Sequence, residues 1–190
     1  ALGKRKYHTH NQHLSHAAAG FQTSNFVDST VVVIDAIGEF DTISIWHAEY
    51  DKNGVAQYKR LWTKKYPDSI GLFYSAMTKR VGLQPLDEEY ILMGMSAYGT
   101  AKHYQEMHDE LIDDRMNIRF KNNLHIGVPD DFLKGADVMD IASSSQLLVE
   151  HLIRNVMFKV PLACFAACRP MNFPHEYRKG VYLSGESSSI

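Results

Sequence analysis

The residues best suited to chemistry lie near the start of the chain, where His8, His10, His13 and His16 fall within nine positions. Imidazole nitrogen is a good ligand for Zn, Fe, Mn, Ni and Cu. His13 and His16 are three residues apart, so they share one face of any helix that they occupy. This spacing indicates a metal site, although it leaves open a solvated or purely structural role. His8 and His10 are interpreted as part of a solvated segment.

A carboxylate that could complete such a site is Asp35. It ends the apolar run "VVVID" and is followed by "AIGEFD". Ligands in α/β proteins commonly bind at strand ends beside a glycine turn, and a buried carboxylate there is costly unless a cation or a donor compensates it. The hypothesis of a metal site therefore requires the side chains of His16 and Asp35 to converge. "IGEFDT" could also be a plain connection between strands, with its glycine at a positive backbone angle.

The elements that must position these residues follow from periodicity. "AAAGF" after His16 favours a helix. The β-branched run 31–34 predicts a buried strand, residues 41–50 alternate as a second strand, "DKNG" predicts a hairpin turn, and residues 55–63 predict a third strand. These three strands form an antiparallel meander.

Beyond Pro67 the apolar spacing becomes helical, which predicts a block of helices after the strands. The expected segments are a helix from Asp68 or Ser69 to about Gly82, helices within 87–99 and 100–114, a strand or hairpin with an Asn-Asn turn within 116–127, a long helix over 136–160 stopped by Pro161, and a strand at "GVYLSGE". The two glycines of "EEYILMGMSAYG" suggest close approach of another group. The fold class is mixed α/β.

Composition excludes several classes of protein. The chain has 190 residues, a formal net charge of −2 and a sequence pI near 6.6, so it offers no basic footprint for nucleic acid. No apolar run approaches the ~20 residues of a membrane helix, and the start has no signal-peptide core. We therefore expect a cytoplasmic protein without membrane or nucleic-acid partners. The absence of a starting methionine suggests that an N-terminal segment is missing.

Four segments, "NQHLSHAAAGF", "VVVIDAIGEFDT", "YPDSIGLFYSAMTKRVGL" and "EEYILMGMSAYG", occur in an order that resembles the carbamoyltransferases related to nodulation protein U and the antibiotic O-carbamoyltransferases. They cover residues 11–100, and "DIASSSQLLVEHL" is similar to a later family helix. The resemblance implies a partial actin/sugar-kinase-like (ASKHA) fold, similar to the tRNA threonylcarbamoyl-transferase module. Residues 1–160 would be a partial metal- and nucleotide-binding domain, and 161–190 a divergent or truncated tail.

The resemblance also implies a metal, most often Fe, with Mn or Zn as alternatives. Asp35 matches the family's first ligating aspartate and His16 its second ligating histidine, whereas the first histidine falls on Gln12, with His13 next to it. The implied ligands are therefore Gln12, His13, His16 and Asp35, and the choice between Gln12 and His13 stays open. An amide oxygen is a harder and weaker ligand than imidazole.

The implied reaction is O-carbamoyl transfer. Carbamoyl phosphate and ATP with Mg would give carbamoyl-adenylate in a separate C-terminal YrdC-like domain, and the metal domain would pass the carbamoyl group to a hydroxyl of a sugar or other small molecule. Asp35, Glu39 and Asp41 would be catalytic.

Gly38 and Gly185 would bind the nucleotide. Glu186 stands where a glycine of the phosphate loop is expected, so the chain alone should be inactive. The alternative is a noncatalytic remnant or accessory binding module of the same fold, and transfer to tRNA is a weaker third possibility.

Overall fold

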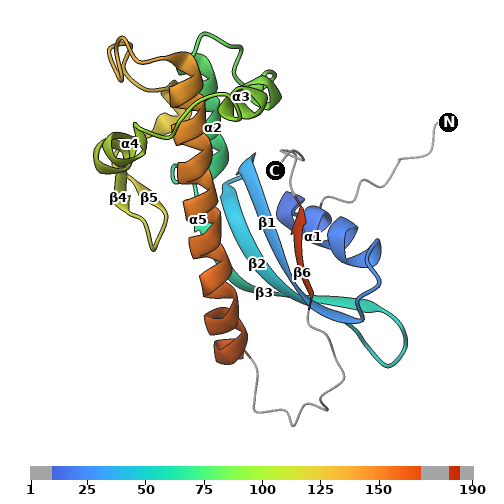
Figure 1. Cartoon of the computed structure of the whole chain (residues 1–190). Coiled ribbons are helices and arrows are strands. Elements are labelled where there is room, and N and C mark those ends of the chain that lie inside the picture. Colours follow the sequence, from blue (N-terminus) through green and yellow to red (C-terminus); the bar gives the residue numbers. More distant parts are fainter. Residues whose placement is uncertain (1–9, 168–179, 185–190) are drawn as a thin grey trace, which may run out of the picture.

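The computed structural model describes residues 10–167 and 180–184, with side chains for residues 10–160. The fold is mixed α/β, and its first three strands precede most of its helices (Figure 1). The elements in chain order are α1 (Gln12–Gln22), β1 (Asp28–Gly38), β2 (Asp41–Tyr50), β3 (Ala56–Lys65), α2 (Ile70–Arg80), α3 (Glu89–Ser96), α4 (Tyr104–Leu111), β4 (Ile112–Asp114), β5 (Arg119–Phe120), the short 3-10 helix η1 (Leu124–Ile126), α5 (Val138–Ala167) and β6 (Gly180–Ser184).

The predicted antiparallel meander is confirmed. Strands β1, β2 and β3 pair antiparallel in sequence order, and Asp51 holds the turn between β2 and β3 by accepting the backbone N–H groups of Asn53 and Val55. The strand predicted near the end of the sequence also forms. It is β6, and it lies parallel to β1 at the other side of the sheet, so that the order is β3-β2-β1-β6.

Helices cover the two faces of this sheet in different ways. Figure 1 shows α5 running across one face and α1 lying on the other. The face under α1 contributes Val31, Val33 and Trp46 to a small apolar cluster with Phe21. The opposite face contributes Val32, Ile43 and Ile45 to a much larger cluster with α2, α3, α4 and α5. Because alternate residues of β1 and β2 are buried against different helices, both strands are apolar along most of their length.

Helix α5 continues past the residue at which we expect it to stop. Proline removes a backbone donor and disfavours the preceding turn, which is why Pro161 predicts an end. The helix nevertheless runs to Ala167, as proline-containing helices do when the surrounding turns persist. Although α5 has 30 residues, no helix within the described part of the chain is both long enough and apolar enough to cross a membrane.

The strand or hairpin predicted within 116–127 forms in part, because strand β5 lies in this segment but its partner β4 precedes it. The short strands β4 and β5 pair around a turn at residues 115–118, where the Asp114 carboxylate accepts the backbone N–H of Asn117 at 3.0 Å. The Asn-Asn pair does not form this turn. Asn123 instead caps η1 by accepting the N–H of His125. Asparagine favours both roles, so sequence alone does not separate them.

Glycines at two helix-associated positions allow close backbone packing. A Cβ on Gly71, in α2, would lie 2.7 Å from Cα of Ala36 at the end of β1, and a Cβ on Gly99 would lie 2.0 Å from the carbonyl oxygen of Met139 in α5. The close approach expected near "EEYILMGMSAYG" therefore occurs at Gly99. Its neighbour Gly94 has no described atom within 4 Å of such a Cβ.

We predict opposite effects for two glycine-to-alanine changes in helices. Gly71→Ala should lower the free energy of unfolding by about 1–3 kcal/mol, because the backbone of Ala36 must move. Gly94→Ala, the matched control in open space, should raise it by up to about 1 kcal/mol through helix propensity. Urea denaturation of both variants measures the difference, and equal effects would contradict this packing.

A second prediction concerns acid stability. The Lys102 ammonium and the backbone and hydroxyl donors of Thr100 lower the pKa of Asp140, near the start of α5, to about 2. A depressed carboxyl pKa contributes stability that is complete above its unfolded value, about 4, and is lost as the pH falls toward 2. Asp140→Asn should therefore reduce the loss of stability between pH 4 and pH 2, as followed by thermal unfolding. An unchanged acid slope would contradict this assignment.

Candidate metal centre

The amino terminus of α1 is held against the β1–β2 turn by Asn11. Its side-chain oxygen accepts the N–H of Leu14 at 3.0 Å, which is a standard helix N-cap, and its amide nitrogen donates to the Glu39 carboxylate at 3.2 Å. This pair of bonds fixes the first turn of α1, including Gln12, beside the end of β1. Glu39 itself is exposed.

Two side chains of α1 approach the carboxylate of Asp35. Asp35 is only 5% exposed. Its Oδ1 accepts the N–H of Ala36 at 2.7 Å, and its Oδ2 accepts Nε2 of Gln12 at 3.1 Å and lies 3.8 Å from Nε2 of His16. Positions 12 and 16 are one helical turn apart, so both side chains reach the same oxygen. The structure therefore meets the requirement that His16 and Asp35 converge.

His13 lies behind this group and is completely buried. Its Nδ1 is 2.7 Å from the Ser44 hydroxyl, and its Nε2 has no hydrogen-bond partner among the described residues. Burial lowers the pKa of His13, although the nearby charges of Asp41 and Asp35 oppose this shift. The ring is therefore neutral near pH 7, the form in which an imidazole nitrogen can bind a cation.

Gly38 is required by the close approach of the His13 ring. A Cβ at Gly38 would lie 2.6 Å from Nε2 of His13 and 3.3 Å from Oδ2 of Asp35. The interpretation that the glycine of "IGEFDT" supplies a positive backbone angle is wrong. The positive angle falls on Glu39, with φ of 60°, and non-glycine residues rarely adopt it. The absence of a side chain at Gly38 thus lets the His13 ring pack directly on the end of β1, close to the Asp35 carboxylate.

Asp41 is buried but is engaged elsewhere. Its Oδ2 accepts from the Arg60 guanidinium at 3.0 Å, and Arg60 also lies over the ring of Trp46, 5.7 Å from the centroid. Asp41 therefore contributes to the site mainly through its charge on His13. Gly185, the other predicted nucleotide-binding residue, lies outside the described residues.

Two cavities differ in their relation to this centre. A cavity of about 300 Å³ adjoins Asp35 and is lined by Ile34, Ala36, Ile70, Gly71, Tyr74, Ser75, Leu86, Asp87, Glu89, Tyr90, Met93 and Val149. Burial raises the pKa of Tyr74, and its hydroxyl, which stays protonated, donates to Gln146 at 3.0 Å. The cavity beside Asp35 therefore combines apolar walls with the hydroxyl groups of Tyr74 and Ser75 and with several carboxylates.

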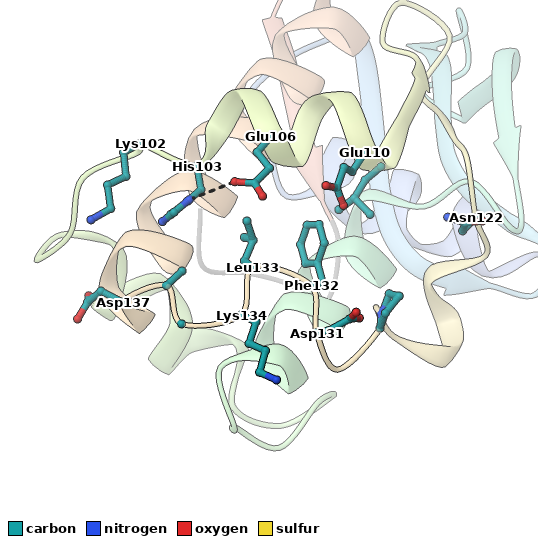
Figure 2. Close-up of a pocket in the computed structure, with 14 residues that line it drawn as sticks. Lys102, His103, Glu106, Glu110, Asn122, Asp131, Phe132, Leu133, Lys134 and Asp137 are labelled. Carbon is teal, nitrogen blue, oxygen red and sulfur yellow. Dashed lines mark hydrogen bonds and ion pairs between the residues drawn. The ribbon is translucent and has the colours of Figure 1, made fainter.

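The larger cavity, of about 800 Å³, lies between α4 and the segment 129–137 (Figure 2). None of its lining residues belongs to α1 or β1. His103 and Glu106, 3.5 Å apart, line one wall, and Lys134 and Asp131 come from the opposite segment. It is therefore separate from the centre at Asp35.

Sequence analysis did not identify three residues that organise this centre. Asn11 is a typical N-cap residue, and the start of the helix could have revealed it. Ser44 faces α1 by strand alternation, which gives a weak signal. Arg60 lies on β3, 19 residues after its partner Asp41, and no sequence pattern links the two.

The fold and this centre define a mixed α/β protein with a His/Gln/Asp cluster at a strand end, and comparison with known proteins specifies the family. The family model "Carbamoyltransferase N-terminus" matches residues 3–155. The chain therefore belongs to that family, and the resemblance recognised from its motifs is confirmed.

Several curated proteins are similar to the chain. The uncharacterized protein sll1178 of Synechocystis is 31% identical over 162 residues, which are 74% of this chain and 26% of that protein. Nodulation protein NolNO of Sinorhizobium fredii is 31% identical over 107 residues, which are 55% of the chain and 15% of that protein. Nodulation protein NolO of Bradyrhizobium diazoefficiens is 34% identical over 97 residues, 51% of the chain and 17% of that protein. The chain thus spans about a quarter or less of the length of these relatives.

We predict that Ser44 positions His13 through its hydroxyl. Ser44→Ala should lower the free energy of unfolding by about 1–3 kcal/mol, because Nδ1 of His13 and Nε1 of Trp46 both lose a buried partner. Ser29→Ala is the matched control, since the buried Ser29 hydroxyl has no partner among the described residues and its loss should be close to neutral. Urea denaturation of both variants checks this, and equal costs would contradict it.

Proposed function

We propose that the chain is part of an ATP-dependent O-carbamoyltransferase that moves a carbamoyl group to a hydroxyl of a sugar or other small molecule. The observation that carries this proposal is the convergence of Gln12 and His16 on one oxygen of the buried Asp35. Membership of the carbamoyltransferase N-terminal family supports the type of group transferred. The cytoplasm remains the compartment in which we place the reaction.

The donor types at this centre suit a divalent cation, but the ligand atoms of His13, His16 and Asp35 do not all lie within 4.8 Å of one another, so a side chain would have to turn to bind it. Asp35 supplies a carboxylate oxygen, His16 an imidazole nitrogen, and His13 a buried Nε2 that no other described group satisfies. A buried polar atom without a partner is costly, so the unsatisfied Nε2 of His13 favours a ligand beside the ring. We propose His13, His16 and Asp35 as ligands, with Gln12 as the stand-in. Fe suits this mixture of nitrogen and oxygen donors, as do Mn and Zn.

The residues of the chain would share the chemistry as follows. When bound, the cation would supply Lewis-acid polarisation of a carbamoyl or phosphate oxygen. Asp35 would hold the helix and the strand in register through Gln12, and the neutral His13 would keep its ring fixed by Ser44. Glu39, which is exposed at the turn and accepts from Asn11, would face the donor substrate. The cavity beside Asp35 is where we place the acceptor hydroxyl, which would gain by proximity.

The nucleotide part of the proposal rests on strand order. Three antiparallel strands followed by helices and a strand parallel to β1 are compatible with one half of an ASKHA-type domain. ATP with Mg and carbamoyl phosphate, or carbamoyl-adenylate made from them, would be the donor substrates. Gly38 and Gly185 would approach the nucleotide, and Asp35, Glu39 and Asp41 would line the reacting groups.

A second candidate is a noncatalytic remnant or accessory binding module of the same fold, which would bind ligands without turnover. The two candidates differ in turnover. Combined with the remaining domains of a relative such as sll1178 and supplied with carbamoyl phosphate, ATP and an acceptor, the chain should restore carbamoyl transfer to the acceptor if it is part of the enzyme, and should restore none if it is a noncatalytic module.

We predict that the purified chain retains a divalent metal. Near-stoichiometric Fe, Mn or Zn should be found by elemental analysis, and the metal content should fall by about one equivalent per chain in the His16→Ala/Asp35→Ala double variant, because both donors of the converging pair are removed. His108→Ala, in an exposed His-Asp pair on α4, is the matched control and should keep the metal.

A variant that binds the metal more tightly tests the ligand assignment without the risk that the protein has merely failed to fold. Gln12→His places imidazole where the family motif has it, so the variant should bind the metal more tightly than the wild type in a chelator competition. A metal-free wild type with a normal circular dichroism spectrum, or a Gln12→His variant that binds no better, would contradict the proposed ligands.

A further inference from the structure

A second cluster of ligand-type side chains lies at the opposite end of β1. Asp28 begins β1, and His47 and Glu49 lie near the end of β2. Asp35 lies seven residues after Asp28 on the same strand, which corresponds to about 23 Å along an extended strand. This cluster is therefore distinct from the centre at Asp35. His47 and Glu49 are not part of the centre proposed for carbamoyl transfer.

The register of the sheet brings the three side chains together. Asp28 is paired directly with Glu49 across β1 and β2, and Thr30 is paired with His47. His47 and Glu49 are two residues apart on one strand, so they point to the same face. Nε2 of His47 lies 3.0 Å from Oδ1 of Asp28, and one ligand atom from each of the three residues lies within 4.8 Å of the other two.

This arrangement costs free energy in the absence of a counter-ion. Two carboxylates placed directly opposite each other on adjacent antiparallel strands are unfavourable, and of the two only Asp28 has His47 within hydrogen-bond distance. Two paired central strands hold the residues, so the like charges are not free to separate as they would be on loops. The Asp28 and His47 side chains are 32% and 22% exposed, respectively, so a hydrated ion can reach them.

We propose that Asp28, His47 and Glu49 form a site for a divalent transition-metal cation, with Zn²⁺ favoured. One imidazole nitrogen and two carboxylate oxygens match the donors that Zn²⁺ accepts, and at 2.0–2.2 Å from each donor the ion would leave a fourth position for water. Glu49, the most exposed of the three, would close the remaining distance by rotation of its side chain. The bound cation would tie the start of β1 to the end of β2.

The group that opposes such a cation is Lys59. It is exposed on β3 and is the direct cross-strand partner of His47, so its ammonium lies on the same face as the cluster. Its positive charge should weaken the affinity for a second cation through repulsion, which salt screens. Lys59→Gln should therefore raise the affinity for the cation, whereas removal of a ligand should lower it.

The experiment is a titration of the ¹⁵N-labelled chain with Zn²⁺, followed on the histidine ring resonances and the backbone amides. Saturable shifts should appear at His47, Asp28 and Glu49, separately from any at His13 and His16. Glu49→Gln, which keeps the shape of the side chain, should weaken these shifts by at least about tenfold in affinity, because even indirect supports of a metal ligand contribute that much. Lys59→Gln should tighten binding.

His108→Ala is the matched control, because His108 and Asp109 form a 3.0 Å pair without a third ligand among the described residues. Its titration at His47 should equal that of the wild type. Ring resonances of His47 that do not move at millimolar Zn²⁺, or a Glu49→Gln titration identical to that of the wild type, would overturn this site. Because the two sets of resonances are read separately, failure here leaves the centre at Asp35 to its own test.

Discussion

The close approach of the first turn of α1 to the end of β1 is the constraint on which the rest of the site depends. A carboxylate that is 5% exposed, an imidazole without exposed surface and a glycine meet there, and each fits only because the others leave room. Asp35 holds α1 through Gln12, Asn11 holds the turn through Glu39, and Ser44 holds His13 from the sheet. Hydrogen bonds from α1, the β1–β2 turn and β2 thus compensate the cost of burying these polar side chains.

Sequence reasoning predicted the elements that periodicity encodes. The meander of β1, β2 and β3 follows from alternation and from the "DKNG" turn, and α2 begins after Ser69, whose side chain accepts the N–H of Leu72. The misses have physical causes. Proline at position 161 disfavours a helix locally, but the turns on both sides persist to Ala167. The short β4–β5 ribbon depends on the Asp114 turn rather than on the more obvious Asn-Asn pair.

The proximity of α1 side chains to Asp35 was predictable where spacing along the chain defines it and not where packing does. The pair of His16 and Asp35 could be inferred from one residue on a helix and one at a strand end. Which of Gln12 and His13 approaches Asp35 could not be inferred from the sequence, because it depends on which side of α1 faces the sheet. The structure places Gln12 at the carboxylate and His13 in the interior, with its ring against Gly38. Likewise, only the pairing of β1 with β2 reveals that Asp28 and Glu49 are neighbours.

The contact between α2 and β1 has a consequence for recognition. The Ser69 hydroxyl donates to the carbonyl of Ala36 at 2.7 Å, and Gly71 packs on the same residue from the opposite side of the strand end to α1. Helices α1 and α2 therefore both contact the end of β1 that carries Asp35. The backbone there has little conformational freedom left to lose on binding a ligand. Such preorganisation lowers the entropic cost of association, so binding at this strand end should proceed with little backbone rearrangement.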